Sequence, residues 1–255
     1  IAGAAIASSV SEAVSLLFFI IYTGTTADKR KYGFRRAFTF RPHLLKGMLS
    51  ISGWTMVQSF ISVSIWFIFF LAIEHLGERP LAVTNIVRNI SALLIMVISA
   101  FATTAGALIS NQIGAGEQRY LFRTCGMTLN LTYAILVPLL VILCLFPEPV
   151  LRVFTDNPSL IAASINSVYV MSTSTLIMAP AFILFNAVSG TGNTKAGFIM
   201  EMISLTVYTA AVYYIVIRLK PDVALCWFSE HVYGIALIAL AWWYLKSGKW
   251  RGKKV

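Results

Sequence analysis

The sequence is poor in charged residues, and acidic residues are the scarcest of them. Charged residues make up 12% of the chain, against about 25% in a typical soluble domain. Hydrophobic residues make up 58%, and the mean hydropathy is +0.79. A soluble domain cannot bury so much apolar surface, whereas a bilayer requires apolar side chains on every outward face of a spanning helix. The composition therefore excludes a soluble globular domain.

Cysteines and catalytic groupings are also scarce. The three cysteines, Cys125, Cys144 and Cys226, lie in or beside apolar segments and lack the spacing of disulfide or metal sites. The three histidines stand far apart, near the ends of apolar runs. No residues are spaced as in hydrolytic or redox sites, so we expect no enzyme, no metal site and no organic cofactor.

Seven apolar runs account for most of the chain. A transmembrane helix needs about 20 apolar residues. The runs cover residues 2–22, 46–73, 81–109, 125–146, 160–188, 196–217 and 223–245. Glycine and proline mark the breaks between them. We therefore predict an all-α polytopic membrane protein with about seven transmembrane helices.

The net charge of +10 is concentrated beside these runs. Twelve of the 20 Lys and Arg residues lie within 29–46 and 246–254, directly after apolar runs. If the first loop is cytoplasmic and the loops alternate, fifteen Lys and Arg face the cytoplasm and four face the other side. This asymmetry predicts a cytoplasmic C-terminus. The clustering also argues against a nucleic-acid partner.

Four ionisable residues lie inside the runs, namely Glu12, Arg88, Glu201 and Glu230. An ionised side chain costs about 2.5–3.5 kcal/mol in hydrocarbon on insertion scales. Two interpretations are open: they line a cavity that binds a cation or a charged substrate, or they pair with one another or reach the interface. Glu12 lies in mid-span, whereas Glu201 lies near the cytoplasmic end of its run and could extend to the interface.

Two runs carry polar side chains at helical spacing. In the run 46–73 these are Ser52, Thr55, Gln58, Ser59 and Ser62, followed by Trp66. In the run 81–109 they are Asn85, Arg88, Asn89, Ser99 and Thr103. Such stripes either line a solvated cavity or form hydrogen bonds between helices and to their own backbone.

Pro180 interrupts the run 160–188. A proline inside a helix frees a backbone carbonyl and bends the helix. We therefore predict Pro180 as a candidate hinge, although kinks also occur without a mechanical role.

The first and last runs share a short motif. Ser11-Glu12 and Ser229-Glu230 lie at similar depths in spans of the same orientation. Six spans separate equivalent positions, as in a parallel duplication of six helices. Chance similarity of two short stretches is the alternative.

Four segments resemble, in order and spacing, motifs of the multidrug and toxic compound extrusion (MATE) transporters. Residues 3–12 are similar to that family's sixth helix, and residues 76–86 to its junction between helices seven and eight. Residues 113–116 resemble the end of helix eight, and residues 189–194 the glycine turn before helix eleven. The resemblance covers nearly the whole chain.

The resemblance implies twelve helices in two six-helix lobes, which export drug-like, often cationic, substrates in exchange for sodium ions or protons. Residues 1–24 would be the last helix of the N-terminal lobe and residues 25–45 a basic cytoplasmic linker. Residues 46–246 would be the C-terminal lobe and 247–255 a basic cytoplasmic tail. The missing N-terminal lobe, with an acidic site of its own, would be a partner of this chain in the bilayer of the plasma (inner) membrane.

We expect polar groups at five positions to face the central cavity. These are Glu12, Gln58, Asn85, Asn89 and Glu230, and we expect Arg88 to pair with an acid. Many MATE members carry a carboxylate in helix seven, where this sequence has Gln58 and Ser59. Neither can carry that charge, so ion coupling through this position is not expected.

Two other functions are considered. A lipid-linked oligosaccharide flippase of the same superfamily would need a strongly cationic cavity, whereas the charges at membrane depth here are three acids and one arginine. A seven-helix receptor is suggested by the number of spans, but no lysine lies deep in a run to attach retinal.

The two-lobed arrangement gives a first prediction. Half of a transporter lacks one wall of its cavity, so residues 1–255 expressed alone should give no drug efflux. Dye efflux from cells that express only these residues, compared with cells that express the full-length protein, checks this. Efflux by the shorter chain would refute the arrangement.

Overall fold

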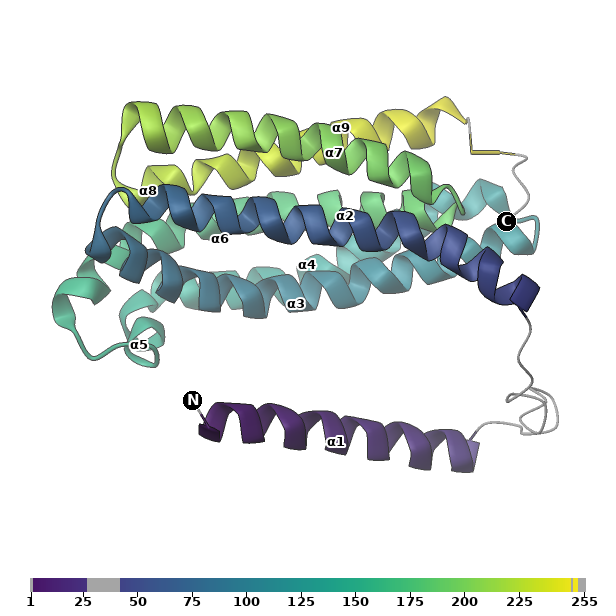
Figure 1. The fold of residues 1–255 in the computed structure, drawn as a ribbon, viewed down its shortest axis with the longest axis horizontal. Coiled ribbons are helices and arrows are strands. Elements are labelled where there is room, and N and C mark those ends of the chain that lie inside the picture. Colours follow the sequence, from purple (N-terminus) through teal and green to yellow (C-terminus); the bar gives the residue numbers. More distant parts are fainter. Residues whose placement is uncertain (1, 27–41, 249, 252–255) are drawn as a thin grey trace. The chain divides into compact units, whose positions relative to one another are not determined.

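The computed structural model describes residues 2–26, 42–248 and 250–251, and its described secondary structure is helical throughout. The longer helices are α1 (Ala2–Thr26), α2 (Pro42–Glu74), α3 (Glu78–Gly114), α4 (Leu121–Leu145), α6 (Pro158–Gly190), α7 (Thr194–Val212) and α9 (Phe228–Ser247) (Figure 1). The shorter ones are η2 (Gln118–Tyr120), α5 (Pro147–Arg152), the π-helix η3 (Tyr213–Leu219) that continues α7, and α8 (Val223–Cys226). Seven helices are long and apolar enough to cross a membrane. The predicted all-α polytopic fold is therefore confirmed.

The chain divides into two compact units, Ile1–Leu49 and Ser50–Val255. The first unit contains α1 and the start of α2, and the second contains the rest of α2 and all later helices. The division into 1–24, 25–45, 46–246 and 247–255 stays a prediction. Most of the predicted linker and part of the tail lie outside the described residues.

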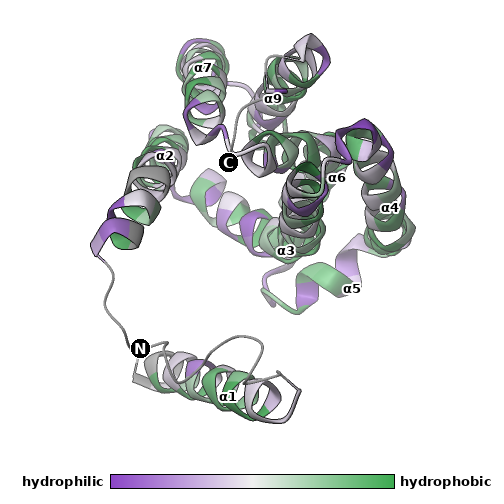
Figure 2. Cartoon of the chain, turned by 90° about the vertical axis from the view of Figure 1, so that its right-hand side faces the viewer, coloured by the Kyte–Doolittle hydropathy of each residue, from purple (hydrophilic) through white to green (hydrophobic). Residues whose placement is uncertain are grey.

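Helix α6 is the centre of the second unit. The buried share of its most apolar stretch is 56%, against 28% for the spans of α3 and α4. It packs most extensively on α3 and also contacts α9 and α4 (Figure 2). Ile98, Leu136 and Met171 belong to a buried cluster among α3, α4 and α6. A second buried cluster, which includes Ile109 and Leu245, joins α3 and α6 to α9.

Helix α2 is attached to this bundle mainly near its C-terminal end. Phe69 and Ile73 are buried there against Tyr208 and Val212 of α7 and Val216 of η3. Nearer its start, Trp54 of α2 packs on Phe198 of α7, with ring centroids 5.1 Å apart. In the described part of the chain, α2 makes few close backbone approaches to other helices along its length. The second unit is therefore a tightly packed scaffold with one helix held more loosely at its side.

Polar caps define where the helices start. The side chain of Asn157 accepts a hydrogen bond from the Ser159 backbone amide and starts α6. Asn193 does the same for α7 through the Ala196 amide, at 3.2 Å. Gly192 precedes it with φ 78°, a left-handed conformation that glycine adopts without strain. Asn193 also donates to the Tyr244 hydroxyl at 2.6 Å, which ties this turn to α9.

The backbones of α3 and α6 cross at two glycines. A Cβ on Gly190 would lie 2.5 Å from the carbonyl oxygen of Gly106, and a Cβ on Gly106 would lie 2.9 Å from that of Asn186. Real Cβ atoms do not approach a backbone oxygen so closely, so any side chain here would push the helices apart. Small residues of this kind are common where helices pack closely in membranes.

This crossing gives a stability prediction. We expect Gly190→Ala to lower the free energy of unfolding by about 1–3 kcal/mol, because the added methyl group overpacks a backbone contact. Thermal unfolding of the full-length protein in detergent measures the effect. Gly126→Ala in α4 is the matched control, since a Cβ there meets nothing within 4 Å. Equal stability of the two variants would show that the crossing is not tight.

Candidate functional site

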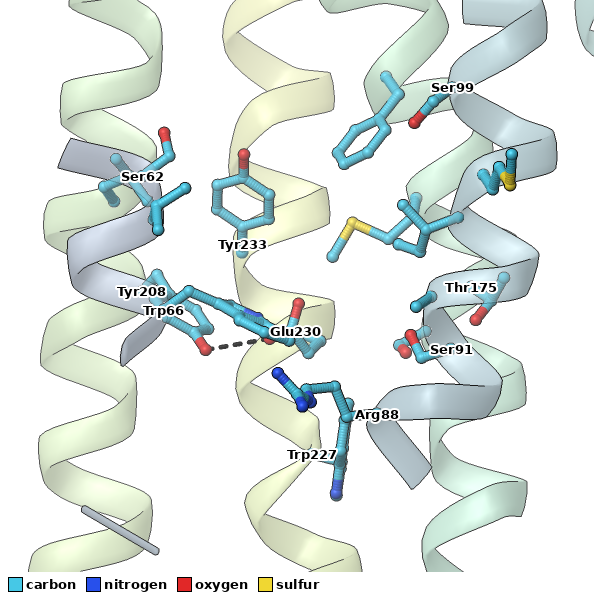
Figure 3. Close-up of a pocket in the computed structure, with 18 of the residues that line it drawn as sticks. Ser62, Trp66, Arg88, Ser91, Ser99, Thr175, Tyr208, Trp227, Glu230 and Tyr233 are labelled. Atoms are coloured by element: carbon cyan, nitrogen blue, oxygen red, sulfur yellow. Dashed lines mark hydrogen bonds between the residues drawn. The ribbon is translucent and has the colours of Figure 1, made fainter. Parts of the chain in front are cut away.

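A cavity of about 470 Å³ lies among α2, α3, α6, α7 and α9 in the second unit (Figure 3). Aromatic and apolar side chains form most of its lining, with several hydroxyl groups among them. The charged residues of the lining are Arg88, Glu201 and Glu230. All three are ionisable residues that the sequence places inside apolar runs.

Glu201 of α7 is held inside the bundle. It is 4% exposed, and its Oε1 accepts hydrogen bonds from the Ser62 hydroxyl and the Tyr233 hydroxyl, both at 2.9 Å. Its Oε2 is buried without a hydrogen-bond partner among the described residues. The side chain thus does not extend to the interface, and it links α2, α7 and α9 at one carboxylate.

Glu230 of α9 makes the reciprocal contact. It accepts a hydrogen bond from the Tyr208 hydroxyl of α7 at 3.0 Å (dashed line in Figure 3). Each of these two helices therefore supplies one carboxylate and one phenol, Glu201 and Tyr208 from α7, and Glu230 and Tyr233 from α9. The two tyrosine rings pack edge to face, with centroids 5.8 Å apart. We call these four residues the Glu–Tyr lattice.

Arg88 enters the cavity from α3 (Figure 3). Its guanidinium lies 5.8 Å from the ring centroid of Trp66 and 5.2 Å from that of Phe70, which is cation–π range. Its Nε is buried without a hydrogen-bond partner, and in the described part of the chain it forms no ion pair. The expected pairing with an acid is thus replaced, in the described residues, by aromatic contacts.

The residues that were predicted to face a cavity lie at different places in the structure. Glu230 and Arg88 line the cavity. Asn85 and Arg88 line a second cavity of about 460 Å³ between α2 and α3, together with Glu74 at its edge. The amide of Asn85 donates to the backbone carbonyl of Leu81.

The other predicted positions are not part of either cavity. Asn89 is exposed and Gln58 is partly buried, and neither is among the lining residues. Glu12 lies on α1 in the first unit, so its role stays a prediction. Pro180 lies within α6 between the lining residues Met178 and Phe182, and its hinge role also stays a prediction.

Both interpretations of the polar stripes apply, to different residues. Ser62 and Ser99 line the cavity. Thr55 and Thr103 instead donate to carbonyls of their own helices.

The two tyrosines of the lattice were not predicted from the sequence. The signal was present, because Glu201 and Tyr208 are seven residues apart and so lie on the same face of α7.

A polytopic helical protein with ionisable groups around an internal cavity is typical of membrane transporters. The model of the MatE family matches residues 55–215, more than half of the chain. The chain therefore belongs to the MatE family, which confirms the resemblance to MATE transporters and removes the seven-helix receptor as an alternative.

One relative and several solved structures support this assignment. The chain is 24% identical over 213 residues to the "Probable multidrug resistance protein NorM" of Thermotoga maritima, which covers 82% of this chain and 46% of the relative. A point mutant of the MATE transporter VcmN of Vibrio cholerae superposes with a TM-score of 0.74 at 16% identity, over 84% of this chain and 49% of that one. A MOP superfamily transporter of Pyrococcus furiosus has a TM-score of 0.69 at 12% identity, over 78% and 44%.

At these identities the structures show the fold alone. The chain spans about half the length of the relatives it matches.

The lattice gives a prediction for Tyr233. Replacing it by Phe removes one of the two donors to a buried carboxylate, and we expect a loss of about 1.5–3 kcal/mol in the free energy of unfolding, the usual value for a hydrogen bond to a charged group. Thermal unfolding of the full-length protein provides the measurement. Tyr214→Phe, at an exposed position of η3, should leave stability unchanged. If both variants unfold alike, the hydrogen bond to Glu201 does not contribute to the free energy of unfolding.

Proposed function

We propose that this chain is part of a secondary active exporter, which removes small organic compounds from the cell in exchange for sodium ions or protons by alternating access. In this proposal α1 is the last helix of an N-terminal lobe, and α2 to α9 form the C-terminal lobe. The observation that carries the proposal is the presence of two carboxylates, Glu201 and Glu230, in one internal cavity of a MatE family chain.

The carboxylates supply the chemistry that exchange requires. An ionised carboxylate in a low-dielectric cavity is stabilised by a cation, which can be a sodium ion, a proton or the charged group of a drug. Such ligands exclude one another when they share a site. A protein that alternates between two open states can then release one cation as it accepts another, provided the ligands differ in their affinity for the two states.

The rest of the lining suits an organic substrate. Trp66, Phe182, Tyr208 and Trp227 contribute aromatic surface, on which flat, hydrophobic molecules can stack. The volume of about 470 Å³ lies within the range of drug-sized pockets, about 300–1,000 Å³. Aromatic contacts are tolerant of shape, which favours many substrates over one.

The polarity of the cavity argues against the flippase alternative. A lipid-linked oligosaccharide carries phosphates and requires a strongly cationic cavity, whereas this one holds one arginine against two glutamates. The Pyrococcus furiosus transporter is described as having a binding pocket of reverse polarity that suggests a different function. Pocket polarity is therefore a useful criterion here, and it favours an exporter of compounds with a cationic group.

The proposed location is the plasma (inner) membrane, with the C-terminus in the cytoplasm. Its support is the excess of Lys and Arg in alternate loops of the sequence.

Glu230→Gln in the full-length protein tests the proposal. The amide keeps the shape of the side chain but cannot carry the charge, so we expect drug efflux to fall about tenfold, the effect of losing about 1.4 kcal/mol of cation binding. Efflux of a fluorescent cation from cells, or from vesicles with an imposed sodium or proton gradient, measures this and identifies the coupling ion.

Glu117→Gln is the matched control, because Glu117 is exposed in the loop after α3. Its efflux should equal that of the wild type. Unchanged efflux by Glu230→Gln at equal protein levels would remove Glu230 from the transport site.

A further inference from the structure

Arg88 has hydrogen-bonding capacity that its neighbours do not use. Its guanidinium carbon lies 5.8 Å from the ring centroid of Trp66 and 5.2 Å from that of Phe70. These cation–π contacts provide no oxygen acceptor for the N–H donors of the guanidinium. The buried Nε has no hydrogen-bond partner among the described residues, and no carboxylate of that part of the chain lies within 4.0 Å of the side-chain nitrogens.

An unmet acceptor lies in the same cavity. Glu201 is 4% exposed, and its Oε1 takes both of its hydrogen bonds, from Ser62 and Tyr233. Its Oε2 is buried and has no partner in the described residues. The lattice thus holds this carboxylate through one oxygen and leaves the other oxygen without a hydrogen bond.

The two unmet groups require opposite chemistry. A guanidinium fork pairs best with a planar anion such as a carboxylate, through two parallel N–H···O bonds. A carboxylate oxygen needs a donor, and a cationic one is the strongest. A simple organic cation would satisfy Glu201 and leave Arg88 unpaired, and a buried charge without a partner is costly.

We propose that the cavity selects zwitterionic substrates, with Arg88 binding an anionic group of the substrate and Glu201, together with Glu230, binding its cationic group. This inference rests on the proposed function and deepens it, because it assigns a substrate class to the same cavity. It makes Arg88 the residue that distinguishes a zwitterion from a cation of the same shape.

Tetramethylrhodamine and its methyl ester are matched probes for this. The first is a zwitterion, and esterification of its carboxylate makes it a cation with the same ring system. Fluorescence anisotropy with the purified full-length protein gives the Kd of each dye. We expect the wild type to bind the zwitterion about tenfold more tightly than the ester, as a charge-assisted hydrogen bond allows.

Arg88→Gln should raise the Kd of the zwitterion about tenfold and leave that of the ester unchanged or lower. Arg88→Lys, which keeps the charge but not the fork, should lie between the two. Arg218→Gln is the matched control, because Arg218 contacts the ring of Tyr213 in η3 and lies outside the cavity. It should change neither Kd.

A wild-type protein that binds the ester as tightly as the zwitterion overturns the inference, and this comparison needs no variant to fold. An equal change of both Kd values in Arg88→Gln overturns it as well. In either case, export of the ester by the wild type under a sodium or proton gradient leaves the proposed function standing. Export of neither dye, nor of other organic cations, under both gradients would instead overturn the proposed function itself.

Discussion

Hydrocarbon offers no hydrogen-bond partner, so a polar group within a span depends on partners inside the protein. The Glu–Tyr lattice gives each of its two carboxylates such a partner by a crossed exchange between α7 and α9, in which each helix gives one acceptor and one donor. Because the two bonds lie at different heights, they fix both the rotation and the register of the two helices. Ser62 adds α2 to the same arrangement through Glu201. The cavity depends on this lattice for one of its walls.

The opposite wall of the cavity, formed by α3 and α6, is held by a different kind of interaction. Helices α3 and α6 approach closely at Gly106 and Gly190, where backbone packs directly against backbone. One wall is thus fixed by steric contact and the other by hydrogen bonds to carboxylates. On the proposed function, a cation that binds Oε2 of Glu201 draws on the same carboxylate whose Oε1 accepts the hydrogen bond from Ser62 of α2. Occupancy of the cavity and the position of α2 are then linked, whereas α3 and α6 stay as they are.

The fold was largely predictable because a bilayer imposes a length of about 20 residues on each apolar run. Arg88 and Glu230 were predictable as cavity residues for a related reason, since a charge at that depth needs a partner or water. For Glu201 the position along the run left open that it extends to the interface, whereas in the structure it is buried. Gln58 and Asn89 were selected by spacing; neither lines the cavity described above, and their place in a central cavity between two lobes stays a prediction. Spacing shows which residues share a face, but these helices are apolar on nearly all sides, so it does not show which face turns inward.

The shared Ser-Glu motif has a physical interpretation in the structure. Ser229 is buried and donates to the carbonyl of Cys226, so it belongs to the start of α9, whereas Glu230 lines the cavity. Ser229 therefore contributes to the start of the helix, and Glu230 contributes to the cavity. If the two lobes of the proposed transporter arose by duplication, Glu12 corresponds to Glu230. Ser11 lies in the interior of α1, so it does not share the helix-start position of Ser229. On the proposed function, the last helix of each lobe would then contribute one carboxylate.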